Sequence, residues 1–546
     1  MIRSLFTVST GTLASRLLGF ARDAMVAALL GAGPLADAFL VAFQLVNVVR
    51  RLLTEGALNA ALIPAWLRVH DAEGPVAAAA FAGRVLGTIS VALLVTAGLI
   101  GLLMPVVITA LAPGFAETEK LQFAVVSGRL MLPYLAFAGP ATVMMALLNA
   151  RGRYALTAFS PLLFNITLIL VMIVLVFRNE GAADSAVAIA ATVGVAGLVQ
   201  LLILVLRPGG DRMATPLRVA FDPPMRDFFG KAIPGMIAGS GPQLLLVGGA
   251  IVASASPSAV SWLYFANRLI ELPLGIVGVA TGAVLVPELT RSLRAADRET
   301  LAHAESRGLE LAVGLALPAT LGLIVLGKPI VRMLFEHGAF TAADTAGTAQ
   351  ALIWLALGLP AHVLIKALSP AFFARGDTLA PLLATLKGLA ITILLAIVLG
   401  QLFGASGIAA SIAFGAWNNA LALIRRGITT FGFSIDAAAR RRLPRIVAAA
   451  LGMAALLYLA APFVPGASDS VHGGLVQALL VLALISGGMA VYSLLLGLCG
   501  AIGRAEAVHA IKRTSRPACA SNHQMAIDGA QRSSVIDGAD QTGAES

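Results

Sequence analysis

Apolar residues run along this chain in long stretches, separated by short segments rich in charged residues, glycine or proline. A helix that crosses a bilayer needs about 20 mostly apolar residues, and such windows recur from a few residues after Met1 to residue 500. The pattern predicts an all-α polytopic membrane protein with about fourteen transmembrane helices. The predicted spans are 5-30, 34-66, 85-112, 125-150, 155-177, 185-206, 228-254, 258-290, 308-327, 348-374, 379-401, 406-424, 446-464 and 473-500.

Positive residues collect in alternate loops between these spans. The loops that follow even-numbered spans hold 20 Lys and Arg residues, whereas the opposite set holds about four. Because positive loops stay on the cytoplasmic side, both termini are expected in the cytoplasm. The first apolar stretch contains Arg16, Arg22 and Asp23 and lacks a small-residue cleavage site, so we expect no cleavable signal peptide.

Three local similarities recur at one offset and indicate an internal repeat. They pair residues 60-68 with 283-291, 105-114 with 329-338, and 150-163 with 374-387. A repeat of about six helices predicts two parallel six-helix lobes around a central cavity, plus two extra C-terminal helices. The expected units are an N-lobe (1-206), a cytoplasmic linker (207-227), a C-lobe (228-430), helices 13 and 14 (431-503) and a disordered cytoplasmic tail (504-546).

Composition supports a membrane protein and removes several other classes. The chain is 58% hydrophobic and 12% charged, and its formal net charge is +10. The positive loops explain this charge, so nucleic acid is not an expected partner. Two cysteines and seven scattered histidines provide neither a disulfide framework nor a metal site, and no metal is expected.

The most informative residues are arginines inside the predicted helices. They are Arg16, Arg22, Arg50, Arg51 and Arg268. An ionised arginine at the bilayer centre costs from about 2.5 kcal/mol to more than 10 kcal/mol, so it needs a partner, a water-filled cavity or a ligand. Arg50 and Arg268 lie too deep to reach the interface, whereas Arg16 lies near enough for its side chain to approach it.

Part of this charge has local partners. Arg51 and Glu55 are four residues apart, Arg268 and Glu271 are three apart, and Asn47 can hydrogen-bond Arg50 or Arg51. One interpretation is therefore a set of structural ion pairs. Against it, Asp23 and Asp37 are expected near helix ends, which leaves too few acids for five arginines.

A surplus of arginine in a central cavity predicts an anionic ligand. The guanidinium group stays charged at physiological pH and fits phosphate oxygens in a bidentate manner, so a diphosphate suits it. Carboxylates and sulfates fit the same chemistry.

Five segments resemble the MurJ/MviN family of lipid II flippases, within the multidrug/oligosaccharidyl-lipid/polysaccharide exporter superfamily. They are SRLLGFARD (15-23), GAGPLADAF (31-39), NVVRRLLTEGALNAALIP (47-64), ANRLIELPLGIVGVA (266-280) and LFEHGAFT (334-341). The resemblance implies a bacterial inner-membrane transporter that flips lipid II for cell-wall synthesis, with helices 13 and 14 holding the polyprenyl tail. Membrane lipids and other cell-wall synthesis proteins are its expected partners.

The resemblance also implies roles for single residues. Arg16, Arg22, Arg50 and Arg268 would bind the diphosphate and headgroup of lipid II. Supporting or gating roles would belong to Asp37, Asn47, Arg51, Glu55 and Glu271. Some family members hold sodium through acids in helices seven and eleven, but 228-254 contains no acid, so no sodium site is expected. The family often has proline where this chain reads LVN at 45-47.

No nucleotide-binding or hydrolase motif is present, so neither a cofactor nor covalent chemistry is expected. The membrane potential is the expected driving force, because an anionic headgroup moves outward down an inside-negative potential. Alternatives are a flippase for another lipid-linked oligosaccharide, a cation-coupled drug exporter on the same fold, and a membrane enzyme or scaffold. A drug exporter would need a midplane carboxylate without excess arginine.

Overall fold

The computed structural model is helical along its described residues and contains no strand among them. It describes residues 2-54, 57-206, 214-280, 298-375, 377-432, 436-463 and 471-500. The helices of the first half are α1 (Ile2–Leu30), α2 (Pro34–Thr54), α3 (Ala57–Leu102), α4 (Met104–Leu111), the 3-10 turn η1 (Pro113–Phe115), α5 (Glu119–Met131), α6 (Pro133–Ala150), α7 (Tyr154–Arg178) and α8 (Ala182–Val205). Those of the second half are α9 (Pro223–Gly239), α10 (Gly241–Ala253), α11 (Ala259–Ala280), α13 (Arg298–Phe335), α14 (Ala342–Ala374), α15 (Leu379–Phe431), α16 (Ala437–Ala460), the 3-10 turn η3 (Ala461–Phe463) and α17 (Val471–Leu498).

The predicted all-α fold with about fourteen spans is confirmed, although several spans are built from two helices. The two longest described helices each change direction at a glycine with positive φ. In α3, Gly74 (φ 86°) lies between the end of the second predicted span and the third, and in α15, Gly404 (φ 56°) lies between the eleventh and the twelfth. A side chain is disfavoured in that backbone region, so glycine is the residue that allows each reversal. The predicted second span consists of α2 and the start of α3.

Many large apolar side chains lie on the outside of the molecule. Phe177 is 86% exposed, Leu102 77% and Leu206 75%. Such side chains would be unfavourable in water and are favourable against lipid tails, while each helix satisfies its own backbone hydrogen bonds. The exposed surface therefore fits a multi-pass protein in a bilayer.

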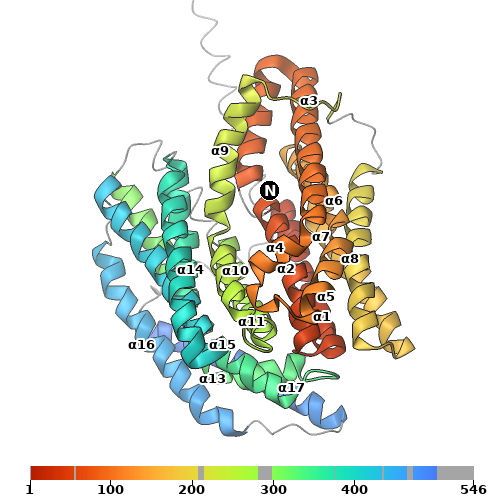
Figure 1. Cartoon of the computed structure of the whole chain (residues 1–546). Helices are drawn as coiled ribbons and strands as arrows, with labels where there is room; N and C mark the ends of the chain where they lie inside the picture. The colour runs from red at the N-terminus through yellow and green to blue at the C-terminus, as the bar shows by residue number, and fades with distance from the viewer. Residues whose placement is uncertain are drawn as a thin grey trace, which may run out of the picture.

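The helices form two groups that lie side by side (Figure 1). One group contains the helices of the first half, α1 to α8, coloured from red to yellow. The other contains α13, α14 and α16, coloured from green to blue, and α9, α10 and α11 lie between the two groups. The helices α16 and α17 pack against each other and against α13.

The two groups meet at the end of the molecule that carries the turn after α1. The backbone N–H of Ala339 donates to the carbonyl of Ala28 at 2.8 Å. The N–H of Gly114 donates to the hydroxyl oxygen of Ser254 at 3.0 Å. We call this region the sealed end, and it is the end predicted to face the periplasm.

At the opposite end, the second half of the chain packs onto the first. Met225, Phe228 and Ala232 of α9 are buried in one apolar cluster with residues of α3 and α6. The preceding segment, 214-222, lies along α3, where the N–H of Thr215 donates to the carbonyl of Ala79 at 3.2 Å. Arg84 of α3 forms an ion pair with Asp222 at 2.7 Å.

Candidate functional site

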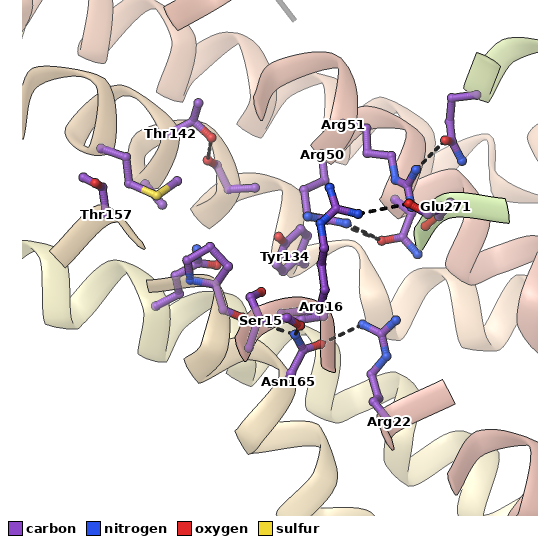
Figure 2. Close-up of a pocket in the computed structure, with 18 of the residues that line it drawn as sticks. Ser15, Arg16, Arg22, Arg50, Arg51, Tyr134, Thr142, Thr157, Asn165 and Glu271 are labelled. Carbon is purple, nitrogen blue, oxygen red and sulfur yellow. Dashed lines mark hydrogen bonds and ion pairs between the residues drawn. The ribbon is translucent and has the colours of Figure 1, made fainter. Parts of the chain in front are cut away.

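A cavity of about 670 Å³ lies where the two groups of helices face each other. Helices α1, α2 and α11 contribute its charged side chains, and α6, α7 and α8 contribute an uncharged wall. Figure 2 shows the arginines gathered on one side of this cavity, with Thr142 and Thr157 on the other. The volume is in the range of about 300–1,000 Å³ that is typical of small-molecule sites.

The structure brings all four predicted binding arginines to this one cavity. Arg16 and Arg22 come from α1, Arg50 from α2 and Arg268 from α11. The cavity lining also includes three of the predicted supporting residues, Asn47, Arg51 and Glu271. Residues more than 200 positions apart in the sequence therefore share one site.

Asp23 lies within this arginine cluster, contrary to the expectation that it would sit too near a helix end to help. Its side chain is 1% exposed. Arg22 donates from Nε and Nη2 to one oxygen of Asp23 at 2.9 and 2.7 Å, and Arg268 of the other half forms an ion pair with the second oxygen. The hydroxyl of Tyr264 also donates to Asp23 at 3.2 Å. The expectation was wrong because α11 passes beside α1 and brings Arg268 and Tyr264 to this carboxylate.

Glu271 is the second acid of the cluster and also joins the two halves. It forms ion pairs with Arg51 of α2 at 2.7 Å and with Arg268 at 2.6 Å. The latter confirms the predicted pair three residues apart. Arg51 also donates to Gln243 at 2.6 Å. Its other predicted partner, Glu55, lies outside the described residues.

Two asparagines support the arginines. The Oδ1 atom of Asn47 accepts from Arg50 at 3.4 and 3.3 Å, as predicted for this pair. Asn165 of α7 accepts from Arg22 at 3.1 Å, and its amide donates to the carbonyl of Ser15 at 3.2 Å. Sequence reasoning missed Asn165, although an amide in the middle of an apolar span is the same kind of signal as a buried arginine.

Two glycines allow the arginines to cross between the halves. A Cβ atom added to Gly275 of α11 would collide with the guanidinium of Arg16, which lies across it. A Cβ atom added to Gly19 of α1 would meet Nη2 of Arg268. Each half therefore provides a glycine against which the arginine of the other half packs. Arg16 also donates to the backbone carbonyl of Glu271 at 3.1 Å.

Asp37 does not line the cavity but lies at the sealed end. It is fully buried and accepts hydrogen bonds from the N–H groups of Ser258 and Ser261, both at 3.0 Å. The hydroxyl of Ser261 donates to it at 2.6 Å, and Lys120 is 3.6 Å away. Asp37 thus fastens α2 of the first half to the start of α11 in the second.

Guanidinium groups dominate the charged side chains that the structure describes around the cavity. Five of them lie there, close to the carboxylates of Asp23 and Glu271. This concentration of positive charge favours an anion, and the forked guanidinium groups suit phosphate oxygens. Within the described ranges, no group of three His, Cys, Asp or Glu residues is placed to hold a metal ion.

The sequence matches a known family over most of its length. The profile of a family described as "Lipid II flippase MurJ" matches residues 26–471. A protein of Rhizobium meliloti named "Probable lipid II flippase MurJ" is 37% identical over 536 residues, which cover 97% of this chain and 99% of that protein. A protein of Burkholderia cenocepacia named "Lipid II flippase MurJ" is 32% identical and covers 84% of this chain and 90% of its own length.

Solved structures share the fold. One described as "Lipid II flippase MurJ, inward closed conformation" has a TM-score of 0.71 at 21% identity and covers 89% of this chain and 98% of its own. An inward-facing multidrug resistance MATE family transporter of the MOP superfamily has a TM-score of 0.61 at 15% identity, covering 81% of this chain and 98% of its own.

Proposed function

The chain belongs to the lipid II flippase MurJ family, and on this premise we propose that it carries lipid II across the bacterial inner membrane for cell-wall synthesis. The direction is from the cytoplasmic to the periplasmic leaflet. The observation that supports this most strongly is the group of five guanidiniums around one cavity between two groups of helices. This concentration of positive charge would stabilise an anionic headgroup in the cavity.

We place the diphosphate of the substrate among Arg16, Arg22, Arg50 and Arg268. Arg51, Asn47 and Glu271 orient these groups through hydrogen bonds and ion pairs, and Glu55 is proposed as a further support. The diphosphate would compete with Asp23 and Glu271 for the guanidiniums, and these acids join α1 and α2 to α11. Binding would therefore weaken the connections between the two halves and favour their movement.

The conformation of the described helices, closed at the sealed end, fits the first step of a transport cycle, in which the headgroup enters. The sealed end is held by Asp37, Ser258 and Ser261 and by the contact between Ala28 and Ala339. With the termini placed in the cytoplasm, this end faces the periplasm, so the headgroup enters from the cytoplasmic side. Opening the sealed end then releases it outward, as in alternating access between two lobes.

The polyprenyl tail requires a separate apolar surface. We place it on α16 and α17, which follow α15 in the chain and pack on α13. Their outward side chains are apolar and exposed, including Tyr458 (71%), Leu459 (67%) and Leu494 (63%). The tail can then remain in contact with lipid and helix while the headgroup crosses. Residues 504-546, predicted to be a disordered tail, lie outside the described residues.

This transport requires neither covalent chemistry nor a cofactor. The inside-negative membrane potential would drive the anionic headgroup outward, at about 2.3 kcal/mol per charge and 100 mV. Lipid II and membrane lipids are the proposed partners, together with other cell-wall synthesis proteins.

The charge pattern argues against a cation-coupled drug exporter. Among the described residues that line the cavity, the carboxylate is Glu271, and it already forms ion pairs with Arg51 and Arg268. The positive charge of the arginines would repel a cationic drug. A flippase for another lipid-linked oligosaccharide would share the arginines, and the family membership favours lipid II over it.

Complementation tests the proposal. The chain is expressed in cells depleted of their own lipid II flippase, and growth and outward exposure of lipid II are measured. We expect the wild type and the Arg178→Ala variant, altered at an exposed position at the end of α7, to restore both. Arg50→Ala and Arg268→Ala should fail. A wild type that inserts normally and fails would contradict the assignment, and active alanine variants would contradict the arginine site.

A further inference from the structure

The cavity has a second wall that the arginine site does not use. Of the residues that line the cavity from α6, α7 and α8, none carries a charge. Among the described residues, its charged lining comes from α1, α2 and α11. The two surfaces are separated in Figure 2, where Tyr134 lies between the arginines and the side that carries Thr142 and Thr157.

This uncharged wall presents hydrogen-bonding groups that have no partner in the described part of the chain. The side chain of Gln200 on α8 is 93% buried, with 7% exposed, lines the cavity and makes no hydrogen bond there. The same holds for the hydroxyl of Tyr134, a residue that is 2% exposed. Both polar groups open onto the cavity, where each can hydrogen-bond a polar ligand that replaces water.

A third group extends the wall toward the start of α7. The hydroxyl of Thr157 lies 2.7 Å from the amide of Asn149 and 2.9 Å from the carbonyl of Tyr154, and it can donate its single hydrogen to either. One contact with Thr157 leaves the amide of Asn149 with further donor and acceptor capacity for the cavity. The side chain of Tyr154 lines the same surface. The wall therefore offers neutral donors, neutral acceptors and aromatic rings.

We propose that this wall, formed by Tyr134, Asn149, Tyr154, Thr157 and Gln200, is the subsite for the uncharged sugars of the lipid-linked substrate. The inference rests on the proposed function and adds the part of the headgroup that each surface recognises. Sugar hydroxyl and acetamido groups both donate and accept, which matches amide and hydroxyl side chains. Tyrosine rings also pack against the apolar faces of sugar rings.

The peptide portion of the headgroup fits this wall less well. Its carboxylates would lie in a buried region without a cationic partner, which is costly. The diphosphate has its own cationic surface on α1, α2 and α11. The division of charge in the cavity thus assigns the phosphates to one wall and the sugars to the other.

Equilibrium binding to the purified full-length protein in nanodiscs tests this assignment with three lipids. They are lipid II, the same lipid without its peptide, and undecaprenyl diphosphate without sugars. The variants Gln200→Leu and Asn149→Leu remove hydrogen-bonding groups from two different helices while keeping similar side-chain volumes. Thr192→Val is the matched control, because Thr192 lies on α8 and donates its hydroxyl to Ala188 of the same helix at 2.7 Å.

We expect each leucine variant to bind both sugar-bearing lipids about five- to tenfold more weakly, as for the loss of one or two hydrogen bonds. Binding of undecaprenyl diphosphate should be unchanged, and Thr192→Val should match the wild type for all three lipids. Arg50→Ala should weaken all three.

Three results would overturn the subsite. Equal weakening for undecaprenyl diphosphate would mean that the wall acts through the phosphates or the fold. A loss seen only with the peptide-bearing lipid would assign the wall to the peptide, and unchanged affinity for lipid II would leave the wall without a ligand role. A wild type that binds none of the lipids would instead contradict the proposed function.

Discussion

Asp23 on α1 and Arg268 on α11 form an ion pair that joins the two halves of the chain beside the cavity. The same carboxylate pairs with Arg22 at 2.7 Å. Separation of α1 from α11 must break the contact between Asp23 and Arg268, and an anion that replaces the carboxylate would lower the cost. The ion pair is thus a link that the proposed substrate can release.

Replacing Asp23 with asparagine should destabilise the protein strongly. The change leaves Arg22 and Arg268 without their shared carboxylate, and breaking a buried ion pair on one side costs about 3–5 kcal/mol. Thermal unfolding of the purified variant should show a lower midpoint, and added undecaprenyl diphosphate should recover more stability than in the wild type. Asp71→Asn, at a side chain that is 77% exposed, is the control. An unchanged midpoint for Asp23→Asn would show that the acid is not needed.

Replacing Gly275 with alanine should impair transport while leaving the fold intact. The added methyl group takes the place of the Arg16 guanidinium, and that flexible side chain can move away at little cost to folding. We expect outward exposure of lipid II to fall by about tenfold, as for a lost charge-assisted hydrogen bond. Gly322→Ala is the matched control, because a methyl group there meets open space. Equal activity of the two variants would show that the position of Arg16 is not important for transport.

Replacing Asp37 with asparagine should loosen the sealed end. The variant keeps its shape but loses the charge that accepts three hydrogen bonds from Ser258 and Ser261 and attracts Lys120. In a background without native cysteines, Ala259→Cys, at a position that is 1% exposed between Ser258 and Ser261, should react several-fold faster with a membrane-impermeant thiol reagent when Asp37→Asn is present. Asp184→Asn, exposed at the start of α8, should leave the rate unchanged. If the reaction rate were the same with Asp37, Asp37→Asn and Asp184→Asn, Asp37 would not be needed to hold the sealed end closed.

Replacing Gly87 with alanine should displace the segment before α9. A methyl group at this position would lie 2.6 Å from the carbonyl oxygen of Arg218, which belongs to the backbone and cannot move alone. Arg218 is exposed, so trypsin should cleave there several-fold faster in membranes of the variant. Gly98→Ala changes the same helix where there is open space and should cleave like the wild type. Unchanged cleavage of Gly87→Ala would mean that the segment is held by other contacts.

Much of the fold follows from the sequence because lipid imposes a simple rule on each span. Apolar length predicted the helices, and Gly74 and Gly404, both with positive φ, mark where α3 and α15 change direction between consecutive predicted spans. The depth of Arg50 and Arg268 identified them as unusual without any knowledge of neighbours. That reasoning needs only the position of a residue along its own helix.

The contacts between helices could not be predicted in the same way. The partnership of Asp23 with Arg268 depends on how α11 lies against α1, and so does the packing of Arg16 on Gly275. Hydropathy gives the depth of a residue but does not specify which face of a distant helix it meets. Gln200 and Asn165 were visible as amides in apolar spans, yet their common cavity is apparent only in three dimensions.

The packing of α9 on α3 determines where the polypeptide can be divided into two separately expressed chains. A break after α10 would leave α9 and the segment 214-222 attached to the half on which they rest. A break before Thr215 would instead require two separately inserted polypeptides to find each other through that docking surface. The same contact that constrains the linker could thus serve as the recognition element for reassembling a split transporter.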